Sequence, residues 1–428
     1  MDTNSFTVGR FKAQANKFSG IISKSLGKVR QRTVRELIFG IQAAKDVKIS
    51  NVARCLNESI DLIKTEERLC RNLAAEDFSE VINNEIIRLA DDKITSEMVI
   101  SIDPGDVVKP YAQAMEHLCG VWDGSQSTSA QGYHLCQVTG ANLQHNKVVP
   151  LYCEAFSSKE EGYITLNDKI KKAIDLVVAR TSTNGVWAID RQGDCKEIIG
   201  HFLQHQLRFV TRLKLNRWLQ TKNKNGGNIC VQAERLHRHM TLPFVARITK
   251  IEDGIEKVIT LRYGVTAVAL QDLPGHTFTA LVVEGFGERP MILLSAEPLP
   301  QKGDPRAAYR ILEIYLTRWK CDECFRYIKQ AYNLEDLRVR SYNAIRNLVA
   351  IVHAIAYFTS VYMGMNLKLR VMVQKVFILS KRFFGIPSFF QYAMADGIYE
   401  LLKRNCAPLT NENDIKKQPS VVLSLFPD

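Results

Sequence analysis

Two short apolar segments that each end in an aspartate constrain the fold of this chain more than any other feature. The first, residues 98–103, reads MVISID, and the second, residues 185–190, reads GVWAID. Apolar side chains on both faces are typical of strands buried inside a sheet. The PGD that follows Asp103 predicts that the first strand stops there. We therefore expect Asp103 and Asp190 at neighbouring strand ends, where the sites of open α/β sheets form.

A later segment places further polar side chains along one face of a helix. Residues 315–329 read YLTRWKCDECFRYIK, with no Pro or Gly and with apolar side chains at helical spacing. At about 100° per residue, four polar side chains fall within an arc of about 60°. These four are Tyr315, Arg318, Asp322 and Lys329. Two cations around one acid suit a phosphate held beside a metal ion.

This spacing, Tyr-x2-Arg-x3-acid-x6-Lys, resembles the signature of bacterial insertion-sequence transposases of the DDE cut-and-paste class. Tyr315, Arg318 and Lys329 match that signature. Asp322 stands where the family has Glu, with Glu323 beside it. Helical periodicity favours Asp322 as the third catalytic acid, because Glu323 points about 100° away. Both residues remain candidates.

The resemblance extends to other segments, over about residues 95–345. It includes KQAYNLEDLRVRSY after the helix, residues 109–125, and the DRxxD motif that begins at Asp190. The resemblance implies a ribonuclease H-like catalytic core and cut-and-paste transposition. Its cofactor would be two Mg²⁺ ions, with Mn²⁺ as a substitute, because carboxylates are the ligands that hard cations prefer. Asp103 is expected to bridge both ions, with Asp190 holding one and Asp322 the other.

The remaining polar face is expected to contact DNA. Arg318 and Lys329 would hold phosphates beside the scissile bond, and Tyr315 would hydrogen-bond one. In the resembled family these residues contact the 5′ phosphate of the strand that is not transferred. Trp319 either stacks on an unpaired base or packs in the core, and the sequence favours neither. Arg212, towards the exposed end of a basic strand, is a further predicted DNA contact.

Composition agrees with a nucleic-acid partner. The 428 residues carry a formal net charge of +12, and a basic excess of this size suggests an anionic partner. The ten cysteines follow no regular framework and the N-terminus lacks an apolar signal segment, which favours a reducing cytoplasm. Cys321 and Cys324 form a CxxC with no second pair, so we interpret them as packing residues in a helix.

The predicted fold class is α/β, with a ribonuclease H-like core, a β-rich insertion and flanking helical regions. The predicted domains are a helical DNA-binding region (1–90), the core (95–217 and 301–345), the insertion (218–300) and a C-terminal helical region (346–428). Basic residues between 10 and 35 suggest amphipathic helices, followed by short helices with a cap at Ser50. A helix-turn-helix-like DNA reader and a bundle that only packs are equal alternatives. Another helix is expected from Asn167, as its cap, to Ala179.

Three further segments have simpler interpretations. Residues 348–365 are apolar enough to suggest a membrane-spanning helix, but His353 and other polar residues favour a buried helix of a globular protein. Residues 405–428 read as a loose tail. The cluster Arg235, His237, Arg238 and His239 reads as solvated surface rather than a ligand set.

The sequence thus predicts a transposase that binds the terminal inverted repeats of its element as a homodimer on DNA. It would cut the duplex and join the element to target DNA. No membrane partner is expected. The expected location is the cytoplasm, with association to the nucleoid when the protein is bound to DNA. One alternative is a degraded or domesticated copy that binds DNA without catalysis, because Asp322 replaces Glu. A free nuclease of the same fold is a third interpretation.

Overall fold

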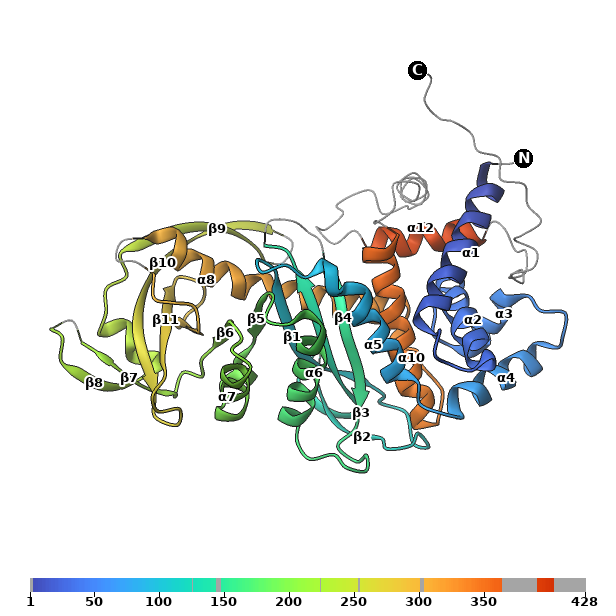
Figure 1. Cartoon of the computed structure of the whole chain (residues 1–428), viewed down its shortest axis with the longest axis horizontal. Coiled ribbons are helices and arrows are strands. Elements are labelled where there is room, and N and C mark those ends of the chain that lie inside the picture. The colour runs from blue at the N-terminus through green and yellow to red at the C-terminus, as the bar shows by residue number, and fades with distance from the viewer. Residues whose placement is uncertain are drawn as a thin grey trace, which may run out of the picture. The chain divides into compact units, whose positions relative to one another are not determined.

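The computed structural model describes residues 3–124, 126–143, 148–223, 225–252, 255–300, 304–363 and 391–403. It has a mixed α/β architecture with one large mixed sheet and many helices, as the sequence predicts (Figure 1). The chain divides into two compact units. Unit 1 comprises residues 1–85, 111–116 and 327–428, and unit 2 comprises residues 86–110 and 117–326. The four-domain division made from sequence stays a prediction.

Unit 2 is organised around parallel strands that carry the two aspartates. The parallel strands, in spatial order, are β1 (Val99–Val108), β5 (Val186–Ile189) and β6 (Phe209–Arg212). Antiparallel strands continue the sheet beyond β1, namely β3 (Thr128–Ala141), β4 (Val148–Phe156) and β2 (Cys119–Asp123). Parallel neighbours require crossovers, which here are α6 (Leu166–Thr181) and α7 (Lys196–Gln204).

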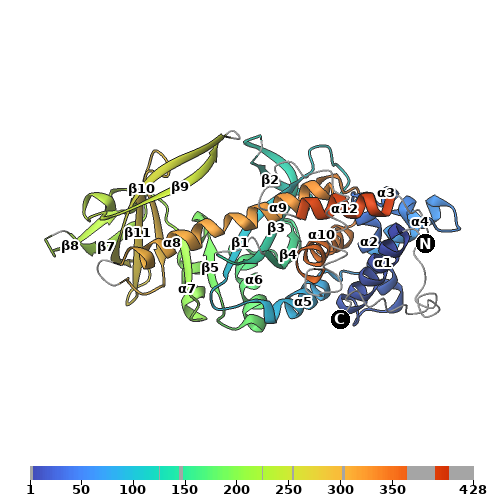
Figure 2. The same cartoon turned by 90° about the horizontal axis from the view of Figure 1, so that it is seen from above.

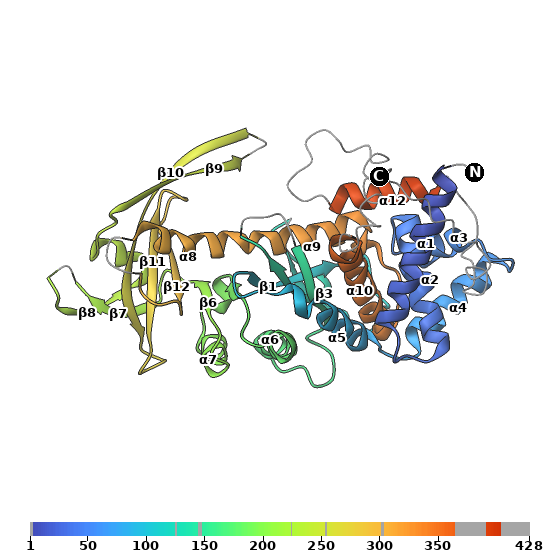
Figure 3. The same cartoon turned by 45° about the horizontal axis from the view of Figure 1, so that its top comes forward.

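The two faces of this sheet pack against different helices. On one face, Val99, Ala188 and Val210 form a buried cluster with α8 (Pro305–Thr317). On the other face, the Trp187 ring lies 5.9 Å from the Phe202 ring of α7, measured between centroids. Figure 3 shows α8 on one side of the sheet and α6 and α7 on the other. Because side chains alternate along a strand, residues 101, 103 and 190 share the α8 side.

The strand-rich segment expected after residue 217 adds strands to the same sheet. These strands are β7 (Trp218–Lys222), β8 (Asn228–Gln232), β9 (Phe244–Glu252), β10 (Ile255–Leu270), β11 (Thr277–Glu284) and β12 (Met291–Ser295). The junction is β12, which pairs antiparallel with β6 through Leu293 opposite Arg212. The short helix η3 (Ala233–Arg238) exposes Arg235 and Arg238, as expected for solvated surface.

Unit 1 is helical over its described residues. Its helices include α1 (Thr3–Ile22), α2 (Lys28–Ala44), α3 (Ile49–Leu56), α4 (Leu62–Ala74), α10 (Tyr342–Tyr357) and α12 (Gln391–Lys403), with α5 (Ser79–Ala90) leading into unit 2. Phe18 of α1 packs against the Phe358 ring at 5.2 Å between centroids. The stretch Tyr342–Tyr362 is long and apolar enough to cross a membrane, but 89% of its 18-residue apolar window is buried inside the protein. That burial agrees with the buried helix that we expected.

Several local expectations need correction. Strand β1 does not stop at Asp103, because β3 hydrogen-bonds along it as far as Val108. Helix α3 begins at Ile49, so Ser50 is not its cap. Helix α6 is capped by Thr165, whose hydroxyl accepts a hydrogen bond from the Asp168 amide, and not by Asn167. The predicted tail, residues 405–428, lies outside the described residues, as do residues 364 and 365.

The segment 315–329 is two helices rather than one. Helix α8 ends at Thr317 and α9 runs from Trp319 to Ala331, with Arg318 between them. The Arg318 amide donates to the Tyr315 carbonyl at 3.2 Å, and the Cys321 amide donates to the Arg318 carbonyl at 2.8 Å. These tighter i to i+3 bonds replace the regular pattern at the junction. Figure 2 shows the two helices following each other along the sheet.

Candidate active site

The register of the parallel strands brings Asp103 and Asp190 to the same level. The last residues of β1 and β5 that pair in parallel are Ser101 and Ala188. Asp103 and Asp190 each lie two residues beyond that pair, on the same face. The Asp190 carboxylate contributes to raising the pKa of Asp103, which agrees with their proximity. The two acids therefore lie near each other, as expected. The parallel pairing of β1 with β5 stops before Asp103, whereas the antiparallel pairing of β1 with β3 continues to Val108.

Helix α9 lies close against β1 because small groups separate them. A methyl group at Gly105 would lie 3.2 Å from the Phe325 ring, so glycine allows the helix this approach. One turn earlier, the Cys321 thiol lies 3.9 Å from the Ser101 carbonyl. Asp322 therefore lies on a helix that is packed directly against β1, the strand that carries Asp103. Gly105 belongs to the PGD motif, which lies within β1 and is not the turn expected from the sequence.

Arg318 joins the two carboxylates. Its Nη1 atom donates to Asp103 Oδ1 at 3.1 Å and to Asp322 Oδ1 at 3.2 Å. The Arg318 side chain is 10% exposed, the Asp103 side chain 18% and the Asp322 side chain 37%. The Arg318 guanidinium also lies 5.8 Å from the centroid of the Tyr315 ring. Charge-assisted hydrogen bonds of this kind fix side chains in place.

The cluster holds more negative than positive charge. Burial raises the pKa of Asp103 well above its usual range, the nearby Asp322 and Asp190 raise it further, and Arg318 opposes them. Burial by itself lowers the pKa of Arg318, but the surrounding carboxylates, Asp322 first, raise it overall. Three carboxylates lie near one guanidinium at this end of the sheet, and two of them, Asp103 and Asp322, are hydrogen-bonded to it. Such an oxygen donor set fits hard divalent cations, which would supply the missing positive charge.

The turn after β5 holds Asp190 through its backbone. The Asp190 carboxylate accepts a hydrogen bond from the Gln192 amide at 2.9 Å. Its backbone carbonyl accepts one from the Thr211 hydroxyl of β6, also at 2.9 Å. A few residues on, Asp194 accepts from the Lys214 amide at 2.7 Å and lies 3.4 Å from Arg217. The second acid of the DRxxD motif is therefore a structural residue that holds the loop after β6.

Gly193 in this turn is expected to tolerate no side chain. A methyl group there would lie 2.2 Å from Ile189 Cγ2 and 2.8 Å from the Thr211 hydroxyl oxygen. We predict that Gly193→Ala lowers the free energy of unfolding by about 1–3 kcal/mol through overpacking. Urea denaturation followed by circular dichroism measures this. Gly287→Ala is the control, since nothing lies within 4 Å of its new methyl group. Equal stability of the two variants would contradict the prediction.

The other predicted site residues lie in different surroundings. Glu323 points away from the acids and pairs with Arg326 at 2.5 Å. Trp319 is 49% exposed, so the core interpretation is wrong, and its ring lies edge-on to Phe286 at 6.5 Å between centroids. Lys329, in the last turn of α9, pairs with Glu335 at 3.1 Å.

Arg212 ends β6 and is partly buried. It is the last β6 residue paired with β12. Its predicted contact with DNA stays a prediction.

The two cysteines of α9 are buried packing groups, as expected. Burial raises the pKa of Cys321, and it raises the pKa of Cys324 to about 12. The Gln137 amide donates to the Cys324 sulfur at 3.1 Å. Thiols held protonated in this way are poor metal ligands.

Comparison with known proteins finds solved structures that are similar to this chain. A chain in the cryo-EM structure of the piggyBac transposase synaptic complex with hairpin DNA has a TM-score of 0.44 and 11% sequence identity to this chain. The likeness covers 95% of this chain and 81% of that one. No protein-family model and no curated protein matches this chain.

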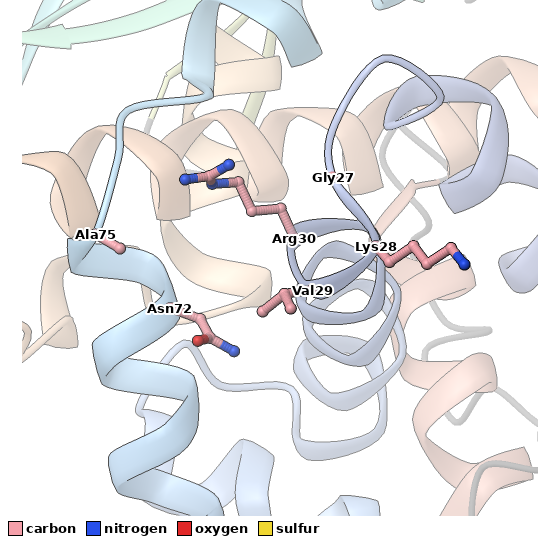
Figure 4. Close-up of a pocket in the computed structure, with 6 residues that line it drawn as sticks. All are labelled: Gly27, Lys28, Val29, Arg30, Asn72 and Ala75. Atoms are coloured by element: carbon pink, nitrogen blue, oxygen red, sulfur yellow. The ribbon is translucent and has the colours of Figure 1, made fainter.

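In unit 1, a pocket of about 330 Å³ lies between α2 and α4 (Figure 4). Its lining includes Lys28, Arg30 and Asn72, but none of the predicted catalytic residues. Arg30 pairs with Glu76. Several other N-terminal cations are similarly engaged: Arg32 pairs with Glu36 and Glu58, and Lys24 pairs with Glu85. The expected basic face of the first helices is therefore partly neutralised by neighbouring acids.

Proposed function

We propose that this chain is a DNA transposase that cuts and joins DNA with the help of divalent metal ions. The observation that supports this most is the convergence of Asp103, Asp190 and Asp322 from two strands and a helix, with Arg318 between them. The strand order β4-β3-β1-β5-β6, with β3 antiparallel to β1, supports a ribonuclease H-like core. The Tyr-x2-Arg-x3-acid-x6-Lys spacing of residues 315–329 favours the insertion-sequence class.

The carboxylates would hold two Mg²⁺ ions, or Mn²⁺ in their place. When bound, such ions activate the attacking oxygen and stabilise the leaving oxygen of a phosphodiester. Asp103 and Asp190, fixed by neighbouring strands, would hold the ions at the sheet edge, and Asp322 would complete the site from α9. Arg318 would donate to a phosphate oxygen, and exposed Trp319 would stack on a base. Lys329 and Arg212 would add contacts along the DNA backbone. Tyr315 is only 4% exposed and packs in the buried cluster that contains α8, so it would support Arg318 rather than contact DNA itself.

The partners in this proposal are the ends of the element and target DNA. The helical residues 1–90 would read the terminal repeats, and a homodimer would assemble on DNA. The net charge of +12 supports an anionic partner. A cytoplasmic protein associated with the nucleoid fits this proposal.

A second candidate is a DNA-binding protein that no longer cuts. Two observations favour it: Asp322 is one methylene shorter than the Glu of the resembled family, and Arg318 already pairs with both Asp103 and Asp322.

The experiment that separates the two uses the full chain and labelled duplexes tiled across the DNA that flanks its coding sequence. We expect binding to one repeated segment and cleavage at its end in Mg²⁺ or Mn²⁺, but not in EDTA. Cleavage of all duplexes alike would indicate a free nuclease. Tight binding without cleavage in either metal would overturn the catalytic proposal in favour of the second candidate.

A further inference from the structure

A second group of ligand-type side chains lies in the helices on the other face of the sheet. Asp175 comes from α6, His201 from α7, and His205 is the C-cap residue that directly follows α7. Figure 1 shows α6 and α7 lying next to each other beside β5 and β6. The three carboxylates of the candidate active site face α8 and α9 instead. The two groups are therefore distinct.

The packing of α7 directs its histidines towards α6. Ile198, Ile199 and Phe202 are buried and hold one side of α7 against the sheet. His201 and His205 are four residues apart, so they lie on the same face of the helix, one turn from each other. Their ring centroids are 4.6 Å apart. Two histidines at this spacing on a helix are a recognised zinc-binding arrangement.

The donor atoms already converge. His201 Nε2 lies 2.7 Å from Asp175 Oδ1, and His205 Nε2 lies 3.0 Å from the same oxygen. One ligand atom from each residue lies within 4.8 Å of the other two. Around a tetrahedral Zn²⁺ bound at about 2.0–2.2 Å, donor atoms are about 3.3–3.5 Å apart. Small side-chain rotations would therefore open enough room for an ion.

The surroundings suit a cation that enters from solvent. The His201 side chain is 12% exposed, His205 32% and Asp175 50%. The nearby Lys171 is engaged by Asp168 at 2.7 Å, and Glu197 adds a further negative charge near that lysine. Three protein ligands leave a fourth position for water.

We propose that Asp175, His201 and His205 form a site for one divalent transition-metal ion, with Zn²⁺ the best match to two imidazoles and a carboxylate. The ion would fasten α6 to α7, the two crossovers that place β5 and β6. Imidazole ligands distinguish this site from the all-carboxylate site for Mg²⁺.

The test uses full-length protein from which any affinity tag has been cleaved and metal removed with a chelator. Zn²⁺ titration by calorimetry should show one tight site per chain, and Co²⁺ should give the visible absorption of a tetrahedral ion with nitrogen ligands. We expect His201→Ala and His205→Ala each to weaken binding by more than about 100-fold. His276→Ala is the matched control, because His276 is an exposed histidine outside the cluster, and it should bind as the wild type does.

Folding is checked separately. Circular dichroism should give the wild-type spectrum for each metal-free variant, and His205→Gln replaces any alanine variant that fails. Zn²⁺ should raise the Tm of the wild type and of H276A but not that of H205Q. Failure of the wild type to bind Zn²⁺ or Co²⁺ would overturn the proposal and leave the cluster as a hydrogen-bonded His–Asp–His contact. Equal binding by H201A, H205A and the wild type would overturn it too.

Discussion

Replacing Asp190 with asparagine is expected to lower metal-dependent DNA cleavage by at least about 10³-fold, which corresponds to about 4 kcal/mol of lost transition-state stabilisation. The amide removes a negative charge from the proposed metal site. It keeps a side-chain oxygen that can still accept the hydrogen bond from the Gln192 amide, so the turn should stay folded. The same loss is expected for Asp103→Asn. Single-turnover cleavage of the labelled end duplex measures both.

The matched control is Asp92→Asn, which changes an exposed aspartate of η1 (Asp91–Lys93) whose side chain is 73% exposed. We expect it to cut at the wild-type rate. DNA affinity, measured in Ca²⁺ or EDTA, should change by less than about threefold in all three variants, because the substitutions act on metal binding rather than on phosphate contacts. Cleavage by D190N at the wild-type rate would remove Asp190 from the catalytic site.

The second large effect should distinguish the two adjacent acids of α9. Asp322→Asn is expected to reduce cleavage by about 10²–10³-fold, because Asp322 lies beside Asp103 and shares Arg318 with it. Glu323→Gln should change the rate by less than about threefold, because its carboxylate pairs with exposed Arg326 instead. The two substitutions remove the same charge from neighbouring residues, so each serves as the control for the other.

The opposite ranking would reassign the third acid to Glu323 and require α9 to rotate on binding DNA. A further variant, Asp322→Glu, restores the side-chain length of the resembled family. A rate equal to or above that of the wild type would support Asp322 as the ligand. Loss of activity in D322E with activity retained in D322N would contradict that assignment.

The convergence of Asp103 and Asp190 could be predicted from sequence because it depends on local patterns. Two apolar runs that each end in an acid predict parallel strands with acids at one edge, and the register between Ser101 and Ala188 places them there. The end of β1 could not be predicted. Pro104 and Gly105 read as a turn, whereas pairing with β3, more than 20 residues away, extends the strand to Val108.

The helix at 315–329 shows where periodicity alone is insufficient. Its spacing correctly placed Tyr315, Arg318 and Asp322 together and turned Glu323 away. It could not reveal the break at Arg318 or the pairing of Lys329 with Glu335, which depends on the chain beyond α9. The role of Gly105 was also invisible, because it depends on the Phe325 ring against it.

The His–Asp–His cluster escaped the sequence analysis because its members are distant in the chain. His201 and His205 have helical spacing, but the short helix that carries them was not predicted, and Asp175 joins them only through the packing of α6 on α7. One signal could have located the two histidines. Two neighbouring parallel strands, β5 and β6, require a crossover helix between them, and residues 196–204 are the segment available for it.

The pairing of β12 with β6 has a mechanical consequence. Leu293 to Ser295 hydrogen-bond along the strand that follows Asp190 and whose Thr211 holds the Asp190 carbonyl. A displacement of β10, β11 or β12 is therefore transmitted to that carbonyl through the backbone hydrogen bonds of the sheet and the Thr211 hydroxyl, not through a hinge. Any ligand bound to those strands would therefore keep a constant orientation relative to the acids.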